Sequence, residues 1–140
     1  MSNSLDRLVW KRAERCCEYC HVSQDCDDLH FEIDHVIAVV HGGQTVAGNL
    51  SLSCLFCNRH KVPNLTGIDP LTRRVTRLFN PWRHVWTFHF RWDGGRLVGL
   101  TAIGRTTVRV LAINDPLRLR LRSELLAEGD FPPRIKAERR

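Results

Sequence analysis

The first apolar residues of the chain recur at helical spacing. Leu8 and Val9 lie three and four residues after Leu5, and Ala13 lies four residues after Val9, so their side chains fall on one face of a helix. This pattern predicts an amphipathic helix over residues 5–15.

The next third of the chain predicts two strands and a short helix. Residues 31–37 alternate so that Phe31 and Ile33 share one face, while polar side chains occupy the other. Residues 49–53 are expected to return as a second strand. A helix follows from Leu55 and must end near Pro63, because proline cannot continue a helix.

The second half repeats strand patterns before it turns helical. Strands are predicted over 74–79, 85–92 and 96–100, with the last two joined by a hairpin at Asp93-Gly-Gly95. Residues 102–113 predict a helix. Residues 117–122 alternate with period two, but the Asp115-Pro116 start, a leucine stripe and Gly129 favour a helix there too. The whole pattern is α+β.

The composition permits a nucleic-acid partner without requiring one. The 140 residues carry a net charge of +6, and arginine supplies nearly all of the excess. The guanidinium suits bidentate phosphate contacts, although many basic proteins bind no nucleic acid. No apolar run is long enough to cross a bilayer, and residues 1–6 do not resemble a secretory signal. A cytoplasmic protein without a membrane partner is expected.

Six cysteines favour a metal site over disulfides, because an even count indicates disulfides only in an oxidising compartment. Two Cys-x-x-Cys pairs lie 33 residues apart, and each spacer can aim two sulfurs at one ion. Four sulfurs close the coordination sphere, so the Zn²⁺ is expected to be structural. Cys16 competes with Cys17, which gives the two-residue spacer, and Cys26 is expected to be a free thiol. The predicted ligands are Cys17, Cys20, Cys54 and Cys57.

The residues between the cysteine pairs point to hydrolysis. Asp34 and His35 place a hard oxygen ligand beside an imidazole, and adjacent strand residues face opposite ways. Phosphodiester hydrolysis needs both a divalent ion near the phosphate and a group that accepts the proton of water. Alternatively, His35 is a hydrogen-bonded histidine of the core without a catalytic role.

Four short stretches between residues 13 and 61 resemble the HNH endonuclease family. They are Glu32-Ile-Asp-His-Val-Ile37, His41-Gly-Gly43, Asn49-Leu-Ser-Leu52 and Cys54-Leu-Phe-Cys-Asn-Arg-His-Lys61.

The resemblance implies a ββα-metal core with His35 as general base. Asp34 and Asn58 would be the protein ligands of a catalytic Mg²⁺ or Mn²⁺, and Asn49 would hold the loop that orients the histidine. The expected substrate is double-stranded DNA, cut by a monomer or a homodimer. Asn58 stands where histidine is usual, and Ala38 replaces a common proline.

The expected organisation has three parts. Residues 1–64 form the zinc-stapled HNH nuclease core, residues 65–133 an α+β extension with a β-hairpin and helices that packs on or beside it, and residues 134–140 a basic mobile tail. The extension resembles that of some bacterial HNH proteins. A non-catalytic zinc-stapled nucleic-acid-binding module and a zinc-dependent interaction domain remain as alternatives.

Two groups of residues in the extension carry open alternatives. The aromatic side chains can form a core, which is favoured, or stack on bases; they are Trp82, Trp86, Phe88, Phe90 and Trp92. The arginines can bind the DNA backbone or cover the solvated faces of two helices; they are Arg105, Arg109, Arg118, Arg120 and Arg122. Lys61 and Arg59 can contact phosphate or remain solvated.

Overall fold

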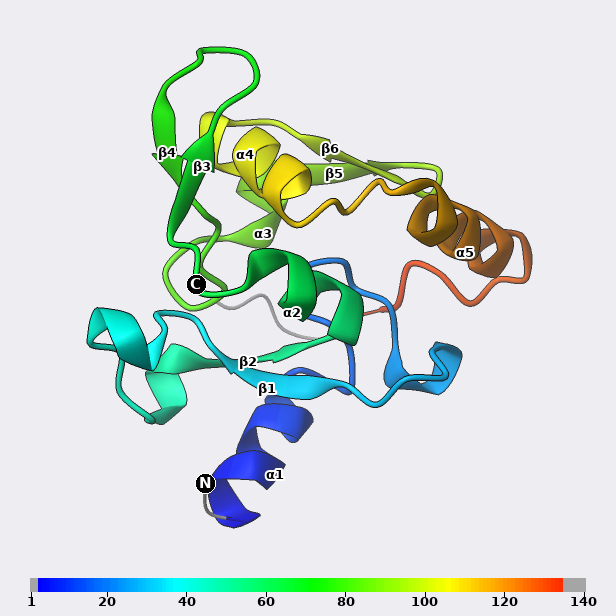
Figure 1. The fold of residues 1–140 in the computed structure, drawn as a ribbon. Coiled ribbons are helices and arrows are strands. Elements are labelled where there is room, and N and C mark those ends of the chain that lie inside the picture. The colour runs from blue at the N-terminus through cyan, green and yellow to red at the C-terminus, as the bar shows by residue number, and fades with distance from the viewer. Residues whose placement is uncertain (1–2, 135–140) are drawn as a thin grey trace.

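The computed structural model describes residues 3–134, so all but the first residue of the tail expected over residues 134–140 lies outside the described residues. Its elements follow the chain in the order shown in Figure 1. They are α1 (Asn3–Arg12), β1 (Glu32–His35), β2 (Leu50–Ser53), α2 (Leu55–Lys61), β3 (Thr66–Ile68), β4 (Val75–Arg77), α3 (Trp86–His89), β5 (Phe90–Asp93), β6 (Arg96–Gly99), α4 (Ala102–Val110) and α5 (Pro116–Ala127).

The first half is a hairpin with one helix on each side. Strands β1 and β2 pair antiparallel, with Asp34 opposite Ser51 and His35 opposite Leu50. Helix α2 begins immediately after β2 and contacts β1, while α1 contacts β2 from the other side of the hairpin (Figure 1). This is the ββα arrangement that the sequence predicts.

The second half adds two hairpins and three helices, of which α3 is a single turn. Strands β3 and β4 pair antiparallel, as do β5 and β6, and α4 contacts β3, β4 and β6. Helix α5 contacts β6. Its start is the predicted one, since the Asp115 side chain accepts a hydrogen bond from the backbone N–H of Leu117 at 3.1 Å, with Pro116 at the first helical position.

One buried core runs through both halves. The indole N–H of Trp86 donates to the backbone oxygen of Tyr19 at 3.2 Å, and Trp86 stacks on the ring of His21. Phe79 meets Tyr19 edge to face, with ring centroids 6.5 Å apart. The extension therefore covers residues that belong to the first cysteine pair and its neighbours.

Two predicted helices are shorter than their patterns indicate. Helix α1 ends at Arg12 rather than residue 15, because Glu14 (φ 52°) and Arg15 (φ 62°) adopt left-handed conformations that turn the chain toward the cysteines. Helix α4 ends at Val110 rather than residue 113, and Ala112 is left-handed at φ 50°.

The strand predicted over 85–92 is wrong in its first half. Residues Trp86–His89 form the helical turn α3, and the strand begins at Phe90. A helical turn directs Trp86 and His89 into the core and leaves Phe88 68% exposed, whereas strand alternation would have buried Phe88 beside Trp86. No helix among the described residues is long and apolar enough to span a membrane.

Candidate active site and zinc centre

The four predicted cysteines converge on one point. The sulfurs of Cys17, Cys20, Cys54 and Cys57 all lie within 4.8 Å of one another, and all four residues are buried. Cys17 and Cys20 lie on a tight turn closed by the backbone N–H of His21, which donates to the backbone oxygen of Cys17 at 2.9 Å. Four thiols at this spacing suit a tetrahedral zinc ion.

The second pair uses the start of α2. Cys54 is the N-cap residue, and its Sγ accepts a hydrogen bond from the backbone N–H of Cys57 at 3.3 Å. A helix N-terminus favours negative charge, which suits thiolate ligands. The same helix thus carries two cysteines of the cluster at one end, and Asn58 and Lys61 further along.

The two other cysteines stand outside the cluster. Cys16 is buried and its thiol donates to the backbone oxygen of Glu14 at 3.4 Å, while burial raises the pKa of Cys16 to about 12. Cys26 is a half-exposed free thiol. The structure thus places Cys17, and not Cys16, in the four-cysteine cluster.

An arginine of the extension reaches the cluster, which the sequence patterns did not indicate. Arg118 Nη2 lies 3.6 Å from Cys54 Sγ, and Nη1 lies 3.2 Å from Asp27 Oδ2. The Arg118 side chain is only 13% exposed. Four thiolates around Zn²⁺ leave a net charge of −2, so a guanidinium here offsets part of that charge.

Two pairs of polar side chains link β1 to α2. Glu32 and Asp34 alternate along one face of the strand, and Asn58 and Lys61 lie one helical turn apart. Asn58 Nδ2 donates to Glu32 Oε1 at 2.8 Å. Lys61 Nζ donates to Asp34 Oδ2 at 3.0 Å and to the backbone oxygen of His35 at 3.3 Å.

Lys61 is buried, contrary to the expectation that it is solvated or contacts phosphate. Its side chain is 2% exposed, and that of Asp34 is 18% exposed. Burial raises the pKa of the Asp34 carboxyl, and the charge and hydrogen bond of Lys61 partly offset that rise. The lysine therefore favours the ionised carboxylate, which is the form that binds metal.

His35 belongs to the same strand but engages the loop that follows it. His35 Nε2 lies 2.8 Å from Thr45 Oγ1. Its Nδ1 makes no hydrogen bond within residues 3–134. One ring nitrogen is thus fixed by a hydroxyl, and the other is left for chemistry.

Asn49 closes the loop between β1 and β2. Its Oδ1 accepts from the backbone N–H of Ile37 at 2.9 Å, and its Nδ2 donates to the backbone oxygens of Ile37 at 3.0 Å and Gln44 at 2.9 Å. Gly43 lies inside this clamp, where an added Cβ would stand 1.7 Å from the Ile37 oxygen. The clamp places Thr45 opposite His35.

The structure places Asp34, His35 and Asn58 on one ββα unit, but Asn58 contacts Glu32 rather than Asp34. Three residues of this site were not predicted from the sequence to belong to it: Glu32, Thr45 and Lys61. The spacings Glu-x-Asp in a strand and Asn-x-x-Lys in a helix were the available signals for two of them, because each aligns two side chains on one face. Thr45 offered none.

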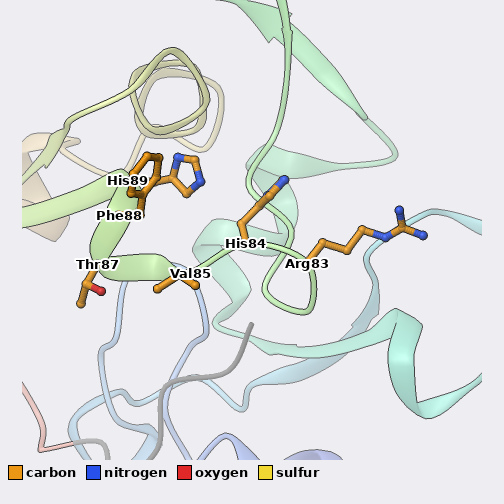
Figure 2. Close-up of a pocket in the computed structure, with 6 residues that line it drawn as sticks. All are labelled: Arg83, His84, Val85, Thr87, Phe88 and His89. Carbon is orange, nitrogen blue, oxygen red and sulfur yellow. The ribbon is translucent and has the colours of Figure 1, made fainter.

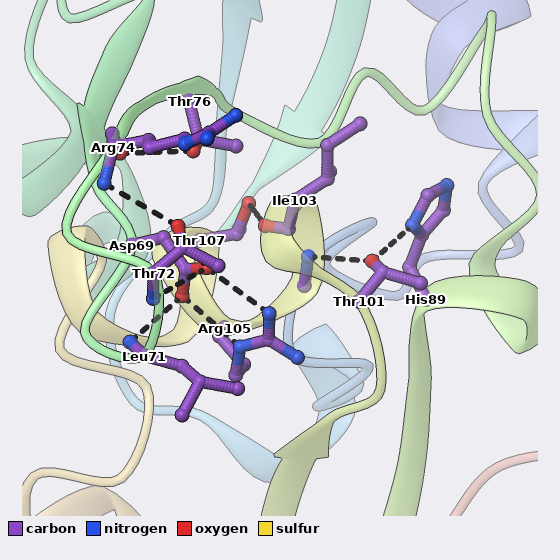
Figure 3. A network of polar contacts seen from close by, with 11 residues as sticks. Asp69, Leu71, Thr72, Arg74, Thr76, His89, Thr101, Ile103, Arg105 and Thr107 are labelled. Carbon is purple, nitrogen blue, oxygen red and sulfur yellow. Dashed lines mark hydrogen bonds and ion pairs between the residues drawn. The ribbon is translucent and has the colours of Figure 1, made fainter.

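The remaining histidines expected to be structural are held by the extension. His84 Nδ1 accepts from the backbone N–H of Asn80 at 2.9 Å. His89 Nδ1 lies 2.6 Å from Thr101 Oγ1, which also caps α4 by accepting from the N–H of Gly104 (Figure 3). Burial lowers the pKa of both histidines.

The aromatic residues and arginines of the extension do not all follow one of the two alternatives predicted for each group. Trp86 and Phe90 are buried in the core, whereas Phe88 is exposed. Arg122 is fully buried and donates to the backbone oxygens of Gly95 and Ile113, so neither prediction made for it holds. Arg105 makes a two-pronged ion pair with buried Asp69, with both N–O distances 3.0 Å (Figure 3).

Comparison with known proteins gives a match, and it covers the segment that contains the cysteine cluster and the candidate active site. Residues 17–63 match the sequence model of the HNH endonuclease family. Comparison with curated proteins and with solved structures gave no significant match. The matched segment begins at the first cysteine of the cluster and ends just after α2, so it contains the whole cluster, Asp34, His35 and Asn58. This segment is an HNH endonuclease domain, of a family that cleaves nucleic acid.

Proposed function

We propose that the chain is a metal-dependent endonuclease that hydrolyses phosphodiester bonds in double-stranded DNA. The observation that carries the proposal is the placement of Asp34 and His35 on one strand, with Asn58 on the helix that packs against it. His35 is the general base, and Asp34 and Asn58 are ligands of a divalent ion. A binding module without catalysis would need none of the three in this arrangement.

The donors at this edge fit Mg²⁺ or Mn²⁺. Asp34 Oδ1 and Asn58 Oδ1 accept no hydrogen bond within residues 3–134, and both are the hard oxygen ligands that these ions prefer. A carboxylate already paired with Lys61 and an amide already held by Glu32 have little freedom to reorient. When bound, the ion supplies charge neutralisation at the scissile phosphate and at the leaving oxygen.

The Thr45 hydroxyl can accept a hydrogen bond from Nε2–H of His35, which is the tautomer that the proposal needs. When Nε2–H donates to Thr45 Oγ1, Nδ1 keeps its lone pair and can accept a proton from the attacking water. The hydroxyl also fixes the plane of the ring. Thr45 is therefore a positioning residue, and the Asn49 clamp holds Thr45 in place.

Plasmid cleavage tests the proposal. Purified protein is incubated with supercoiled plasmid in Mg²⁺, in Mn²⁺ and in EDTA, beside His35→Ala and the control His41→Ala, whose histidine is exposed on the same loop. We expect cleavage by wild type and His41→Ala only with metal, and at least a hundredfold loss in His35→Ala. Equal cleavage by all three contradicts the role of His35, and DNA binding without cleavage favours the non-catalytic module.

The position of Thr45 gives a second comparison. Thr45→Val removes the hydroxyl at nearly constant volume, and Thr45→Ser retains it. We expect kcat to fall about tenfold in the valine variant and to recover in the serine variant, with KM unchanged in both. Equal kcat values in the two variants would contradict the positioning of His35 through this hydroxyl.

A further inference from the structure

A basic groove runs from the candidate active site into the extension. The hollow has a volume of about 300 Å³, and its wall combines Val36, Ile37 and Lys61 of the HNH domain with Asn64, Arg77 and Arg83. Val36 directly follows His35, and Lys61 touches Asp34. We call this hollow the Arg77–Arg83 groove. The wall of the groove therefore includes the residue that follows the proposed general base and the lysine that contacts Asp34.

The positive charges of Arg77 and Arg83 are not paired with a carboxylate among residues 3–134. Arg77 ends β4 and Arg83 precedes α3, and both are exposed. No acidic residue lines the groove. Other arginines of the extension form ion pairs within the protein: Arg105 pairs with Asp69, and Arg118 pairs with Asp27.

Arg83 lies between the groove and a neighbouring hollow of the extension, and it lines both. That second hollow, of about 530 Å³, is lined by Arg83 together with His84, Phe88 and His89. Figure 2 shows the Arg83 guanidinium extending away from Phe88 and His89. Arg77 and Arg83 line the same groove of about 300 Å³, so one anionic strand lying in it can meet both guanidinium groups.

We propose that Arg77 and Arg83 bind the phosphate backbone of double-stranded DNA next to the bond that is cleaved, which makes the extension part of the substrate interface. The inference rests on the proposed nuclease function and adds to it, because both residues lie outside the HNH domain matched at 17–63. Paired guanidinium groups on an exposed groove without carboxylates suit phosphate oxygens at successive nucleotides. Such contacts hold DNA irrespective of its sequence.

The chain offers a matched control on the far side of the extension. Arg73 and Arg109 are also exposed and also line a hollow, of about 420 Å³, with Ile68 and Val110. Arg73 lies in the turn between β3 and β4, which projects away from α2 and β1 (Figure 1). Arg73→Ala/Arg109→Ala therefore removes the same charge as Arg77→Ala/Arg83→Ala, but away from the active site.

Binding is measured without cleavage, so that the test does not depend on activity. The probe is a fluorescein-labelled 30-base-pair duplex, titrated by anisotropy with the full chain in EDTA at several salt concentrations; circular dichroism and thermal unfolding verify the fold of each variant. For Arg77→Ala/Arg83→Ala we expect at least a tenfold rise in Kd, and the slope of log Kd against log salt should fall by up to about two. The control pair should change Kd less than threefold.

The outcomes separate this inference from the proposed function. Equal losses in the two double variants would show that only net charge matters, and unchanged binding in Arg77→Ala/Arg83→Ala would remove the groove from the interface; either result overturns the inference even if the wild type cleaves plasmid. A specific loss in Arg77→Ala/Arg83→Ala supports it even if no metal restores cleavage. Absence of duplex binding by the wild type also overturns it.

Discussion

Lys61 Nζ lies 3.0 Å from Asp34 Oδ2 across the interface between α2 and β1. The same ammonium donates to the backbone oxygen of His35 at 3.3 Å, so one lysine holds both residues of the Asp-His pair. Cys54 and Cys57 anchor the other end of this short helix in the cysteine cluster. The helix thereby joins the part of the domain that suits zinc to the strand proposed to carry the chemistry.

Lys61→Met tests this connection. The substitution leaves the Asp34 carboxylate half-buried without its counter-charge, and breaking a pair of this kind costs about 3 kcal/mol of unfolding free energy. Nuclease activity should fall as well, because the carboxylate is no longer held in place. Urea unfolding and plasmid cleavage measure the two effects. Lys11→Met, which removes an exposed lysine of α1, should change neither; equal behaviour of the two variants would contradict the role of Lys61.

Gly43→Ala tests the loop that presents Thr45 to His35. A Cβ at residue 43 would overlap the Ile37 backbone oxygen, and backbone has little freedom to move away. We expect the variant to lose about 1–3 kcal/mol of unfolding free energy and most of its cleavage rate. Gly48→Ala is the control in the same loop, because its added Cβ meets nothing within 4 Å.

The two glycine variants are compared by thermal unfolding and by plasmid cleavage. A loss confined to Gly43→Ala supports a rigid loop closed by Asn49. Similar stability in both variants would mean that the loop relaxes around a larger side chain, and the clamp would then not fix Thr45.

The ββα core follows from the sequence because its signals are local. Alternating residues in β1, the helix-compatible residues from Leu55 onward and Pro63 after the end of α2 each constrain a few neighbouring positions. The leucine stripe of α5 likewise outweighs its period-two arginines, and a helix forms. Packing of this helix buries Arg122, whose guanidinium donates to the backbone oxygens of Gly95 and Ile113. Local pattern and tertiary packing agree in these elements.

Elements and contacts that depend on residues far away in the sequence were not predicted. Strand β3 is only three residues long and contains Gly67, which weakens a strand signal. An added Cβ there would lie 2.4 Å from Val110 Cγ2, so the glycine is needed where α4 packs on the strand. At the site, Lys61 meets Asp34 across 27 residues of sequence, and no local pattern indicates such a pairing.

Arg118→Met tests the contact between α5 and the cysteine cluster. The guanidinium lies 3.6 Å from Cys54 Sγ, and groups just outside a metal's ligands typically affect affinity ten- to a hundredfold. We expect zinc to bind about tenfold more weakly, measured by competition with a chromogenic chelator. Arg120→Met removes an exposed arginine two residues away that pairs with Glu124, and it should leave the zinc affinity unchanged. Identical affinities in both variants would contradict the charge argument.

Asp69→Asn tests a buried ion pair through its dependence on pH. The Arg105 guanidinium, helped by donors from Leu71 and Thr72, holds the pKa of the buried Asp69 carboxyl well below its usual range (Figure 3). A carboxyl with a depressed pKa in the folded state stabilises the fold fully above its unfolded pKa of about 4, and loses that contribution as the pH falls further. The variant should therefore be less stable than wild type at pH 7.

The gap between Asp69→Asn and wild type should narrow progressively below about pH 4, as the unfolded wild-type chain takes up a proton that the folded Asp69 resists. Urea midpoints of both proteins at each pH from 7 to 3 measure this gap. All other titratable groups are the same in both proteins, so the difference between the proteins isolates Asp69. Glu124→Gln, which breaks an exposed pair, should show little gap at any pH. A constant gap for Asp69→Asn from pH 7 to 3 would mean that lost packing, rather than charge, accounts for the effect.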